Sequence, residues 1–129
     1  MGVYFKYRQL EAYKAVVMNI FFYKTLNGRE PVKEEIEKLS RDERLTAYAK
    51  LADIEKYGFD FVKVQFKQIK GKLWEIKYKF KNQHRILYCM QNSNAMILLH
   101  YVKKKTQKLE NKDKHIAEKR MSEVLKNAK

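Results

Sequence analysis

The sequence contains very little cysteine, proline and glycine. Its 129 residues include one Cys, one Pro and four Gly. A single cysteine, Cys89, excludes a disulfide framework, and no group of Cys and His residues has the spacing of a zinc site. The scarcity of Pro and Gly, together with 45% hydrophobic residues, excludes a low-complexity or disordered chain. The sequence therefore predicts one folded domain with its own hydrophobic core.

Long apolar runs are also missing. The longest, Ala95–Leu99, is far shorter than the roughly 20 residues that a membrane-spanning helix needs. Lys and Arg residues interrupt the first fifteen positions and leave no room for the apolar core of a signal peptide. Together with the lone cysteine, these features predict a cytoplasmic protein in a reducing compartment.

Acidic residues are scarce in one segment of the chain. The sequence has 29 Lys and Arg against 15 Asp and Glu, a net charge of +14. Between Val62 and Lys108 there are twelve basic residues and one acid, Glu75, so this segment carries most of the excess. A concentrated positive field favours a polyanionic partner, most often a nucleic acid. A lysine-rich surface that serves only solubility is the weaker interpretation of so local an excess.

The first half of the chain predicts a strand followed by two helices. The β-branched and aromatic residues of Val16–Tyr23 favour a strand. Pro31 suits the first position of a helix that runs to about residue 39. Ser40 is typical of an N-cap for a second helix, with Glu43 as its capping-box partner, and Gly58 is typical of its end.

In the next segment the spacing of the apolar residues changes to the two-residue period of a strand. Apolar and charged residues alternate, which predicts a strand with one buried and one charged face. The apolar set is Trp74, Ile76, Tyr78 and Phe80, and the charged set is Glu75, Lys77, Lys79 and Lys81. A turn at 81–84 leads into a second strand from Arg85. The third strand, Ala95–Val102, is apolar on both faces, which predicts an interior position in the sheet.

The last apolar stripe is helical, because Ala117, Met121, Val124 and Ala128 fall on one helical face. The predicted order is a strand, two helices, an antiparallel meander of three or four strands, and a C-terminal helix. We expect a compact α+β domain over residues 18–129, with helices covering one face of the sheet. Residues 1–17 form an N-terminal extension of unknown role. Either its aromatic residues pack on the domain, or Met18 is the true start of the protein.

Motifs of the common enzyme classes are missing. The sequence has no glycine-rich phosphate loop, no G-x-S-x-G nucleophile motif and no H-E-x-x-H zinc motif. Cys89 lies in an apolar strand, where a buried hydrophobe is expected rather than a nucleophile. The acid pairs at 34–35 and 42–43 lie in predicted first turns of helices, where capping and dipole roles account for them. The sequence therefore predicts neither a metal site nor a cofactor.

A group of basic side chains remains on the predicted sheet. Lys77 and Lys79 project from the charged face of one strand, and Arg85 begins the next strand close to that face. The basic loop 103–108 follows the third strand. Such a cluster can bind a phosphodiester and stabilise the added charge of a pentacoordinate phosphorus, and crowding of cations lowers a lysine pKa toward the range of proton transfer. From the residues alone, a passive phosphate-binding face is a stronger interpretation than catalysis.

Three motifs in this region resemble one known family. They are Gly71–Lys77 (Gly-Lys-Leu-Trp-Glu-Ile-Lys), His84–Tyr88 (His-Arg-Ile-Leu-Tyr) and Leu98–Lys108 (Leu-Leu-His-Tyr-Val-Lys-Lys-Lys-Thr-Gln-Lys). In this order they resemble the phage-derived HigB-like branch of the RelE/ParE toxin superfamily. Its members commonly read G-x-L-W-E-L-R, then Y-R-I-L-Y, then L-L-H-G-F-x-K-K-T-Q-K-T-P. The resemblance extends from about Met18 to the C-terminus.

The resemblance implies a RelE-like fold and the toxin of a type II toxin–antitoxin pair. Such a toxin cleaves mRNA without a metal or cofactor, typically in the ribosomal A site. Its partner is a helix-turn-helix antitoxin, and we expect a heterotetrameric complex. Carried over by motif, the catalytic residues are Arg85 at the scissile phosphate, Lys77, Lys104 and Lys105, with Glu75 in support. The expected RNA contacts are Lys79, Lys81, His84, Lys103 and Lys108.

The motifs also depart from the family pattern. Lys77 replaces an arginine, which keeps the charge but loses the bidentate fork. His84 replaces a tyrosine and is either a proton-transfer group or a surface turn residue without a role. His100 is expected to be structural and Trp74 to belong to the core. No residue is assigned as general acid or base.

Two other functions remain open at this stage. The first is a ParE-like inhibitor of DNA gyrase that acts by protein contact and needs no catalytic cluster. The second is an inactive relative that binds RNA or the ribosome, which the departures at Lys77 and His84 motivate.

Overall fold

A computed structural model describes residues 17–60, 62–104 and 108–126 of the chain. Nearly all of the predicted extension, residues 1–16, lies outside the described residues. The elements follow the predicted order. They are β1 (Asn19–Phe22), α2 (Pro31–Glu37), α3 (Arg41–Tyr57), β2 (Gln65–Lys70), β3 (Leu73–Phe80), β4 (Asn82–Asn92), β5 (Ala95–Lys104) and α4 (Asn111–Lys126).

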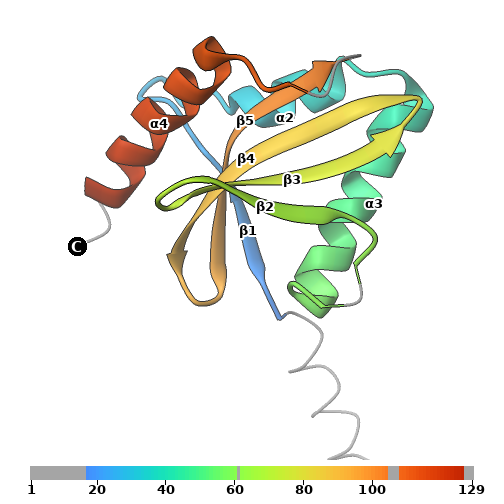
Figure 1. The fold of residues 1–129 in the computed structure, drawn as a ribbon, viewed down its shortest axis with the longest axis horizontal. Coiled ribbons are helices and arrows are strands. Elements are labelled where there is room, and N and C mark those ends of the chain that lie inside the picture. The colour runs from blue at the N-terminus through green and yellow to red at the C-terminus, as the bar shows by residue number, and fades with distance from the viewer. Residues whose placement is uncertain (1–16, 61, 105–107, 127–129) are drawn as a thin grey trace, which may run out of the picture.

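The five strands form one sheet in the order β1-β5-β4-β3-β2 (Figure 1). Strands β2 to β5 are an antiparallel meander, and β1 pairs parallel to β5 at the edge. The interior position predicted for residues 95–102 is confirmed, because β5 lies between β1 and β4 and is buried on both faces. The α+β class, with a strand, two helices, a meander and a last helix, is likewise confirmed.

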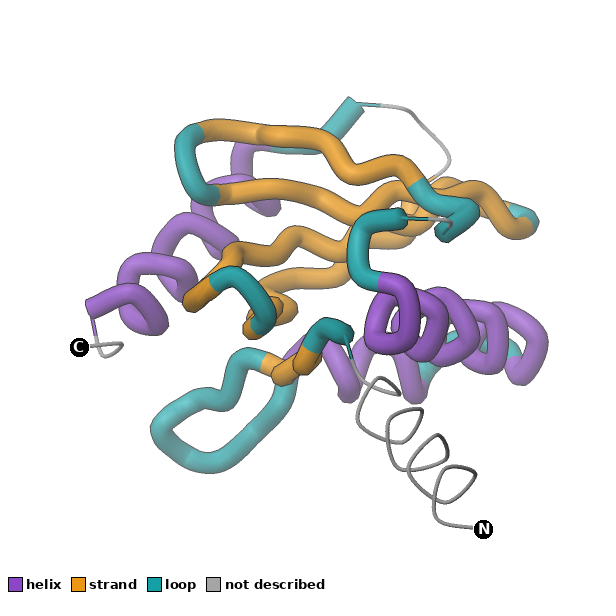
Figure 2. The backbone as a smooth tube through the Cα atoms, turned by 90° about the horizontal axis from the view of Figure 1, so that it is seen from below, coloured by secondary structure: helices purple, strands orange, loops and turns teal. Residues whose placement is uncertain are grey.

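The helices pack on both faces of the sheet, so the expectation that they cover one face is wrong (Figure 2). Helices α2 and α3 cover one apolar cluster, in which Ile36 and Ile54 meet Ile76 and Ile86. Helix α4 covers a second cluster on the opposite face, built around Leu87 and other buried side chains. A strand that is apolar on both sides needs an apolar cover on each side, and α4 provides the second one.

Local sequence determines where the first helices begin and end. Pro31 occupies the first turn of α2, where its missing N–H removes no helical hydrogen bond. Ser40 caps α3, since its Oγ accepts from the Glu43 amide at 3.4 Å. The same Oγ donates to Oε1 of Glu43 at 2.8 Å, so Glu43 contacts the Ser40 side chain where a capping box would have it accept from the Ser40 backbone N–H. Gly58 ends the helix at φ 68°, a conformation that glycine adopts without steric cost.

Strand β2 is the element that the sequence pattern does not reveal. Its residues 65–70 form an edge strand whose pairing with β3 shifts between Gln68 and Lys70. This irregularity interrupts the alternation that marks a regular strand. Its presence makes the meander four strands long, one of the two lengths expected. None of the helices in the described segments has the length and apolar composition needed to cross a membrane.

Candidate nucleic-acid interface

The alternation along β3 and β4 sorts the predicted basic residues onto two faces of the sheet. Glu75 lies between Trp74 and Ile76, which join the core beneath α2 and α3, so Glu75 faces the α4 side. Lys77 and Lys79 share this side with Glu75. Arg85 is in register with Lys77, which puts it on the same side. We call this surface, beyond the N-terminal end of α4, the Arg85 face.

Arg85 forms a buried ion pair with Glu75. The Arg85 side chain is 3% exposed and the Glu75 side chain 0%. Nη1 of Arg85 donates to both carboxylate oxygens of Glu75, at 3.2 and 3.3 Å. Glu75 contacts only Nη1, one of the three guanidinium nitrogens. It therefore positions Arg85 while Nε and Nη2 take no part in the ion pair.

The other two nitrogens of Arg85 are unpartnered. Nε and Nη2 are buried and make no hydrogen bond within the described residues. Leaving a buried charged donor unpaired is costly, and native proteins seldom do so without a functional reason. Nε and Nη2 lie on one edge of the planar guanidinium, the geometry that binds two oxygens of a phosphate at once.

A pocket of about 270 Å³ adjoins Arg85. Its lining includes Lys67 of β2, Lys108, which precedes α4, and Lys114 of α4, and contains no acidic side chain among the described residues. Lys108, one of the expected RNA contacts, thus lines the same pocket as Arg85. The buried Glu75 carboxylate holds Arg85 in place. The side chains of the three lysines are long and are exposed or half-exposed. The pocket can thus accept an anion and close over it.

Lys77 and Lys79 extend the Arg85 face along β3. Lys77 is half-buried and stands directly across from Arg85, and Lys79 is exposed across from Gln83. Two cations in direct cross-strand register repel each other. The Glu75 carboxylate beside Arg85 offsets part of this repulsion, and an anion bound between the two strands would offset more.

Lys104 shares the Arg85 face but is engaged by acids. It is in register with Gln83 and forms ion pairs with Glu110 and with Asp113, the latter at 3.6 Å. The Glu110 carboxylate raises the pKa of Lys104 above its ordinary value, with a smaller contribution from Asp113. This direction is opposite to the lowered lysine pKa expected for proton transfer. Lys104 is therefore protonated at neutral pH and can contribute charge but cannot accept a proton. Lys105 lies outside the described residues.

Three of the predicted RNA contacts lie away from the Arg85 face. His84 belongs to β4 rather than to a turn, is fully buried, and faces α3 on the opposite side of the sheet from Arg85. Lys103 points to the same side and contacts both oxygens of Glu43, at 2.9 and 3.0 Å. Lys81 lies in the hairpin turn and pairs with Asp42 at 3.5 Å. In this structure none of the three is positioned to share a ligand with Arg85.

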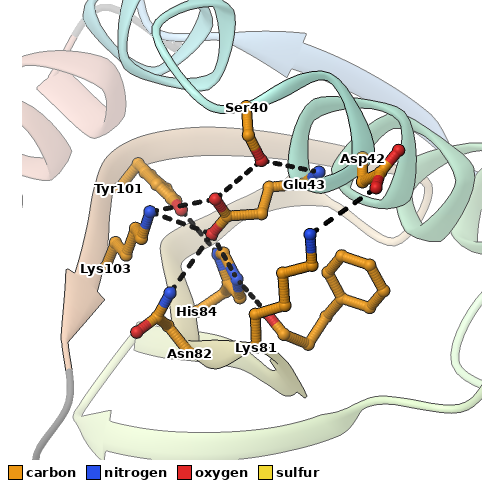
Figure 3. Close-up of polar contacts among 9 residues, drawn as sticks. Ser40, Asp42, Glu43, Lys81, Asn82, His84, Tyr101 and Lys103 are labelled. Carbon is orange, nitrogen blue, oxygen red and sulfur yellow. Dashed lines mark hydrogen bonds and ion pairs between the residues drawn. The ribbon is translucent and has the colours of Figure 1, made fainter.

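These residues form a polar network under the start of α3 (Figure 3). His84 Nε2 donates to the Phe80 carbonyl at 2.9 Å, because a carbonyl only accepts, and Nδ1 lies 2.6 Å from the Tyr101 hydroxyl. Hydrogen bonds from Lys103, Ser40 and Asn82 lower the pKa of the Glu43 carboxyl, against the effect of its burial. Glu43 therefore links α3 to β4 and β5, a role beyond the capping expected from its position.

Several expectations about individual residues are confirmed. Cys89 is fully buried, and burial raises the pKa of its thiol to about 11, so it is a core residue and not a nucleophile. His100 has a partner within the fold, as a structural histidine would, because its Nε2 lies 2.8 Å from the Asp113 carboxylate. Trp74 packs against the core beneath α3.

Sequence reasoning missed two cations of the pocket, Lys67 and Lys114. Lys67 is in register with Glu75, so finding it required recognising β2 as a strand beside β3. Lys114 lies three residues before Ala117, the first apolar residue that marked the C-terminal helix. Extending that helix one turn toward its N-terminus would have placed Lys114 beside the sheet.

The described segments contain no cluster of three or more His, Cys, Asp or Glu residues suited to a metal ion. No curated protein sequence matches the chain. The profile of one protein family, described as phage-derived protein Gp49-like (DUF891), matches residues 34–122. The matched region contains Glu75, Lys77 and Arg85, and most of the chain. The chain therefore belongs to the phage-derived Gp49-like family, a family of RelE/ParE-like toxins.

Proposed function

We propose that this protein is the HigB-like toxin of a type II toxin–antitoxin pair and that it cleaves mRNA on the ribosome. One observation carries the proposal: a buried arginine, with two guanidinium nitrogens that have no hydrogen-bond partner among the described residues, beside a lysine-lined pocket on the sheet. Family membership and the local excess of positive charge support it.

The proposed reaction uses the nucleophile that RNA itself carries. The 2′-oxygen attacks the adjacent phosphorus and the bond to the 5′-oxygen of the next nucleotide breaks. The products are a 2′,3′-cyclic phosphate and a free 5′-hydroxyl. One proton leaves the 2′-hydroxyl and one is delivered to the departing 5′-oxygen, so no metal or external nucleophile is consumed.

Arg85 acts in this scheme on the negative charge that gathers on the phosphorus oxygens. Its Nε and Nη2 donate to two of these oxygens, while Glu75 holds Nη1 and fixes the plane of the guanidinium. Donors fixed in place before the reaction stabilise a charged transition state with little reorganisation. Lys77, on the opposite strand, adds charge to the same oxygens, and Lys104 adds it at longer range.

The proposal includes a small movement at the pocket. Nε and Nη2 are closed to water in this structure, and Lys67, Lys108 and Lys114 line the pocket beside Arg85. Lysine side chains at a surface change rotamer within nanoseconds, so they can move aside and then close on a phosphate. Such closure removes water from the guanidinium, which strengthens its interaction with charge.

The proposed partners are the translating ribosome with its mRNA and a helix-turn-helix antitoxin, in the cytoplasm. An antitoxin that places acidic or bulky side chains over the Arg85 face would block RNA, and we expect a heterotetrameric complex. A gyrase inhibitor that acts by protein contact does not need an unpartnered arginine between lysines. The Arg85 face therefore favours RNA over gyrase.

Primer extension on a defined mRNA, incubated with the protein in the presence and absence of translating ribosomes, tests the proposal. We expect cuts within codons only in the translating sample. Cuts on free RNA would show a ribosome-independent ribonuclease. An intact message in both samples, from a correctly folded protein that still arrests growth, would contradict RNA cleavage and favour gyrase inhibition, which a supercoiling assay detects.

A further inference from the structure

An acidic residue, Glu110, stands at the start of α4 beside the Arg85 face. Its backbone carbonyl accepts from the Lys114 amide at 3.3 Å, so the helix fixes its position. Its carboxylate forms an ion pair with Lys104 of β5. The family pattern continues with Thr-Pro after its last lysine, whereas this chain has Leu109 and Glu110. The acid is therefore a feature of this chain that the family pattern does not include.

Lys104 lies within reach of a phosphate bound at Arg85. Val102 of β5 is in register with Arg85, and Lys104 follows two residues later on the same face of the sheet. Diagonal neighbours on one face are about 7–8 Å apart, a separation that long side chains bridge. An RNA backbone held by Arg85 can therefore extend to Lys104.

The Lys104 ammonium is already engaged by carboxylates. The Lys104 side chain is 17% exposed, but Nζ itself is buried. Glu110 and Asp113 both contact Nζ, the latter at 3.6 Å. A carboxylate and a phosphate are both anions whose oxygens accept from an ammonium. RNA that contacts Lys104 must therefore take the place of a carboxylate.

The two carboxylates differ in how firmly they are held. The Asp113 side chain is 9% exposed, and its Oδ1 lies 2.8 Å from Nε2 of His100. The Glu110 side chain is 52% exposed, and its Oε2 lies 3.6 Å from Nζ of the exposed Lys112. An exposed ion pair contributes little stability, and surface side chains change rotamer within nanoseconds. Glu110 is therefore the carboxylate that can leave Lys104, and Lys112 offers it another cation.

We propose that the Glu110 carboxylate competes with an RNA phosphate for Lys104, so that RNA gains this contact only when it displaces Glu110. The inference rests on the proposed function, because it takes the Arg85 face as the RNA-binding surface. It makes Glu110 a built-in restraint on RNA affinity. The opposite arrangement, in which Glu110 positions Lys104 for RNA as Glu75 positions Arg85, predicts effects of the opposite sign.

Binding of a short single-stranded oligoribonucleotide to the full chain tests this inference. The probe carries 2′-O-methyl groups, which remove the attacking hydroxyl, and affinity is measured by fluorescence anisotropy at several salt concentrations. We expect Glu110→Gln to bind this RNA about fivefold more tightly than wild type. The slope of log K against log salt should become steeper by about 0.7, because Lys104 then gains a phosphate contact.

The control for a lost negative charge is Glu118→Gln. Glu118 lies about two turns further along α4, and its substitution should change the affinity by less than about twofold. Urea unfolding establishes that each variant is folded. Weaker RNA binding by folded Glu110→Gln would overturn the inference, because it would mean that Glu110 positions Lys104 for RNA.

A double variant separates competition for Lys104 from a general repulsion between Glu110 and RNA. In a protein that already carries Lys104→Gln, the further change Glu110→Gln should alter the affinity by less than about twofold, because the contested ammonium is missing. An equal gain in affinity with and without Lys104 would show general repulsion and overturn the inference.

A comparison with Arg85 separates the inference from the proposed function. The double variant Glu75→Gln with Arg85→Gln should weaken RNA binding by about tenfold or more. If it does so while Glu110→Gln leaves the affinity unchanged, the phosphate site stands and the competition is wrong. If Glu110→Gln tightens binding through Lys104 while loss of Arg85 has no effect, the competition stands and the assignment of Arg85 fails.

Discussion

Arg85 and Glu75 form a buried pair on which both the fold and the proposed chemistry depend. Both side chains are buried, and each neutralises the charge of the other. A buried ion pair contributes little net stability, but removing one partner leaves an uncompensated charge. The pair therefore constrains which substitutions can test the site, because the fold is affected together with the chemistry.

Arg85→Ala should destabilise the protein by about 3–5 kcal/mol, because it leaves the Glu75 carboxylate buried without a counter-charge. Combining it with Glu75→Gln should recover most of this loss. Urea unfolding of the two single variants and the double variant measures the coupling. Strictly additive effects would contradict the direct interaction between the two side chains.

Glu43 gives the clearest expectation for pH. Hydrogen bonds from Lys103, Ser40 and Asn82 lower its pKa in the folded state. A carboxyl with a lowered folded pKa stabilises the fold above its ordinary pKa of 4.5, and this stability is lost as the pH falls through the lowered value. Between pH 5 and 3, Glu43→Gln should show a shallower loss of unfolding free energy than wild type. Urea midpoints across this range test it, with exposed Asp60→Asn as the control. Parallel curves for Glu43→Gln and wild type would contradict the prediction.

At the level of elements, the start of α3 anchors the helix to the sheet. Ser40 accepts from the Glu43 amide and contacts the Glu43 carboxylate, and that carboxylate contacts Lys103 and Asn82. Ser40→Ala should lower the unfolding free energy by about 1 kcal/mol, the usual value of an N-cap. Ser93→Ala, in the exposed turn between β4 and β5, is the matched control and should change it little. Equal effects of the two variants in chemical denaturation would exclude a capping role.

Elements marked by strong local signals were predictable from sequence. The alternation over residues 73–80, the Ser40 N-cap and the terminal Gly58 each reflect contacts close in the chain, and each is confirmed. Strand β2 was not predictable by alternation, since its pairing is irregular and an edge strand needs few apolar residues. The two-sided arrangement of helices depends on which apolar stripe meets which sheet face, and no local pattern contains that information.

The candidate site was predictable only in part for the same reason. Arg85, Lys77 and Lys79 share a face because alternation within a strand is a local rule. The side on which His84 and Lys103 lie depends on where the β3–β4 turn ends. The turn was expected at 81–84, but β4 begins at Asn82, so His84 is a strand residue that points into the core. The burial of Arg85 against Glu75 depends on tertiary packing.

For the whole molecule, the uneven charge predicts strong salt dependence of RNA binding. If Lys67, Lys77, Lys79, Arg85 and Lys108 all contact the backbone, log K should fall with log salt at a slope of about −3 to −4 for single-stranded RNA. Lys79→Gln should make the slope shallower by about 0.7. Lys126→Gln, exposed at the far end of α4, removes the same charge and should leave it unchanged. A slope near zero would contradict binding through phosphates.

The most direct test of the central claim, that Arg85 stabilises the reacting phosphate, is the rate of mRNA cleavage by a folded protein without this guanidinium. The double variant Glu75→Gln with Arg85→Gln replaces the buried ion pair by two neutral amides, and Glu75→Gln alone and Lys126→Gln serve as controls. Circular dichroism and urea unfolding establish that each protein is folded, and primer extension in a translating extract gives the rate. We predict that the double variant cleaves at least about a hundredfold more slowly than wild type, whereas Lys126→Gln stays close to it. Cleavage by the folded double variant within a few-fold of wild type would contradict the assignment of Arg85.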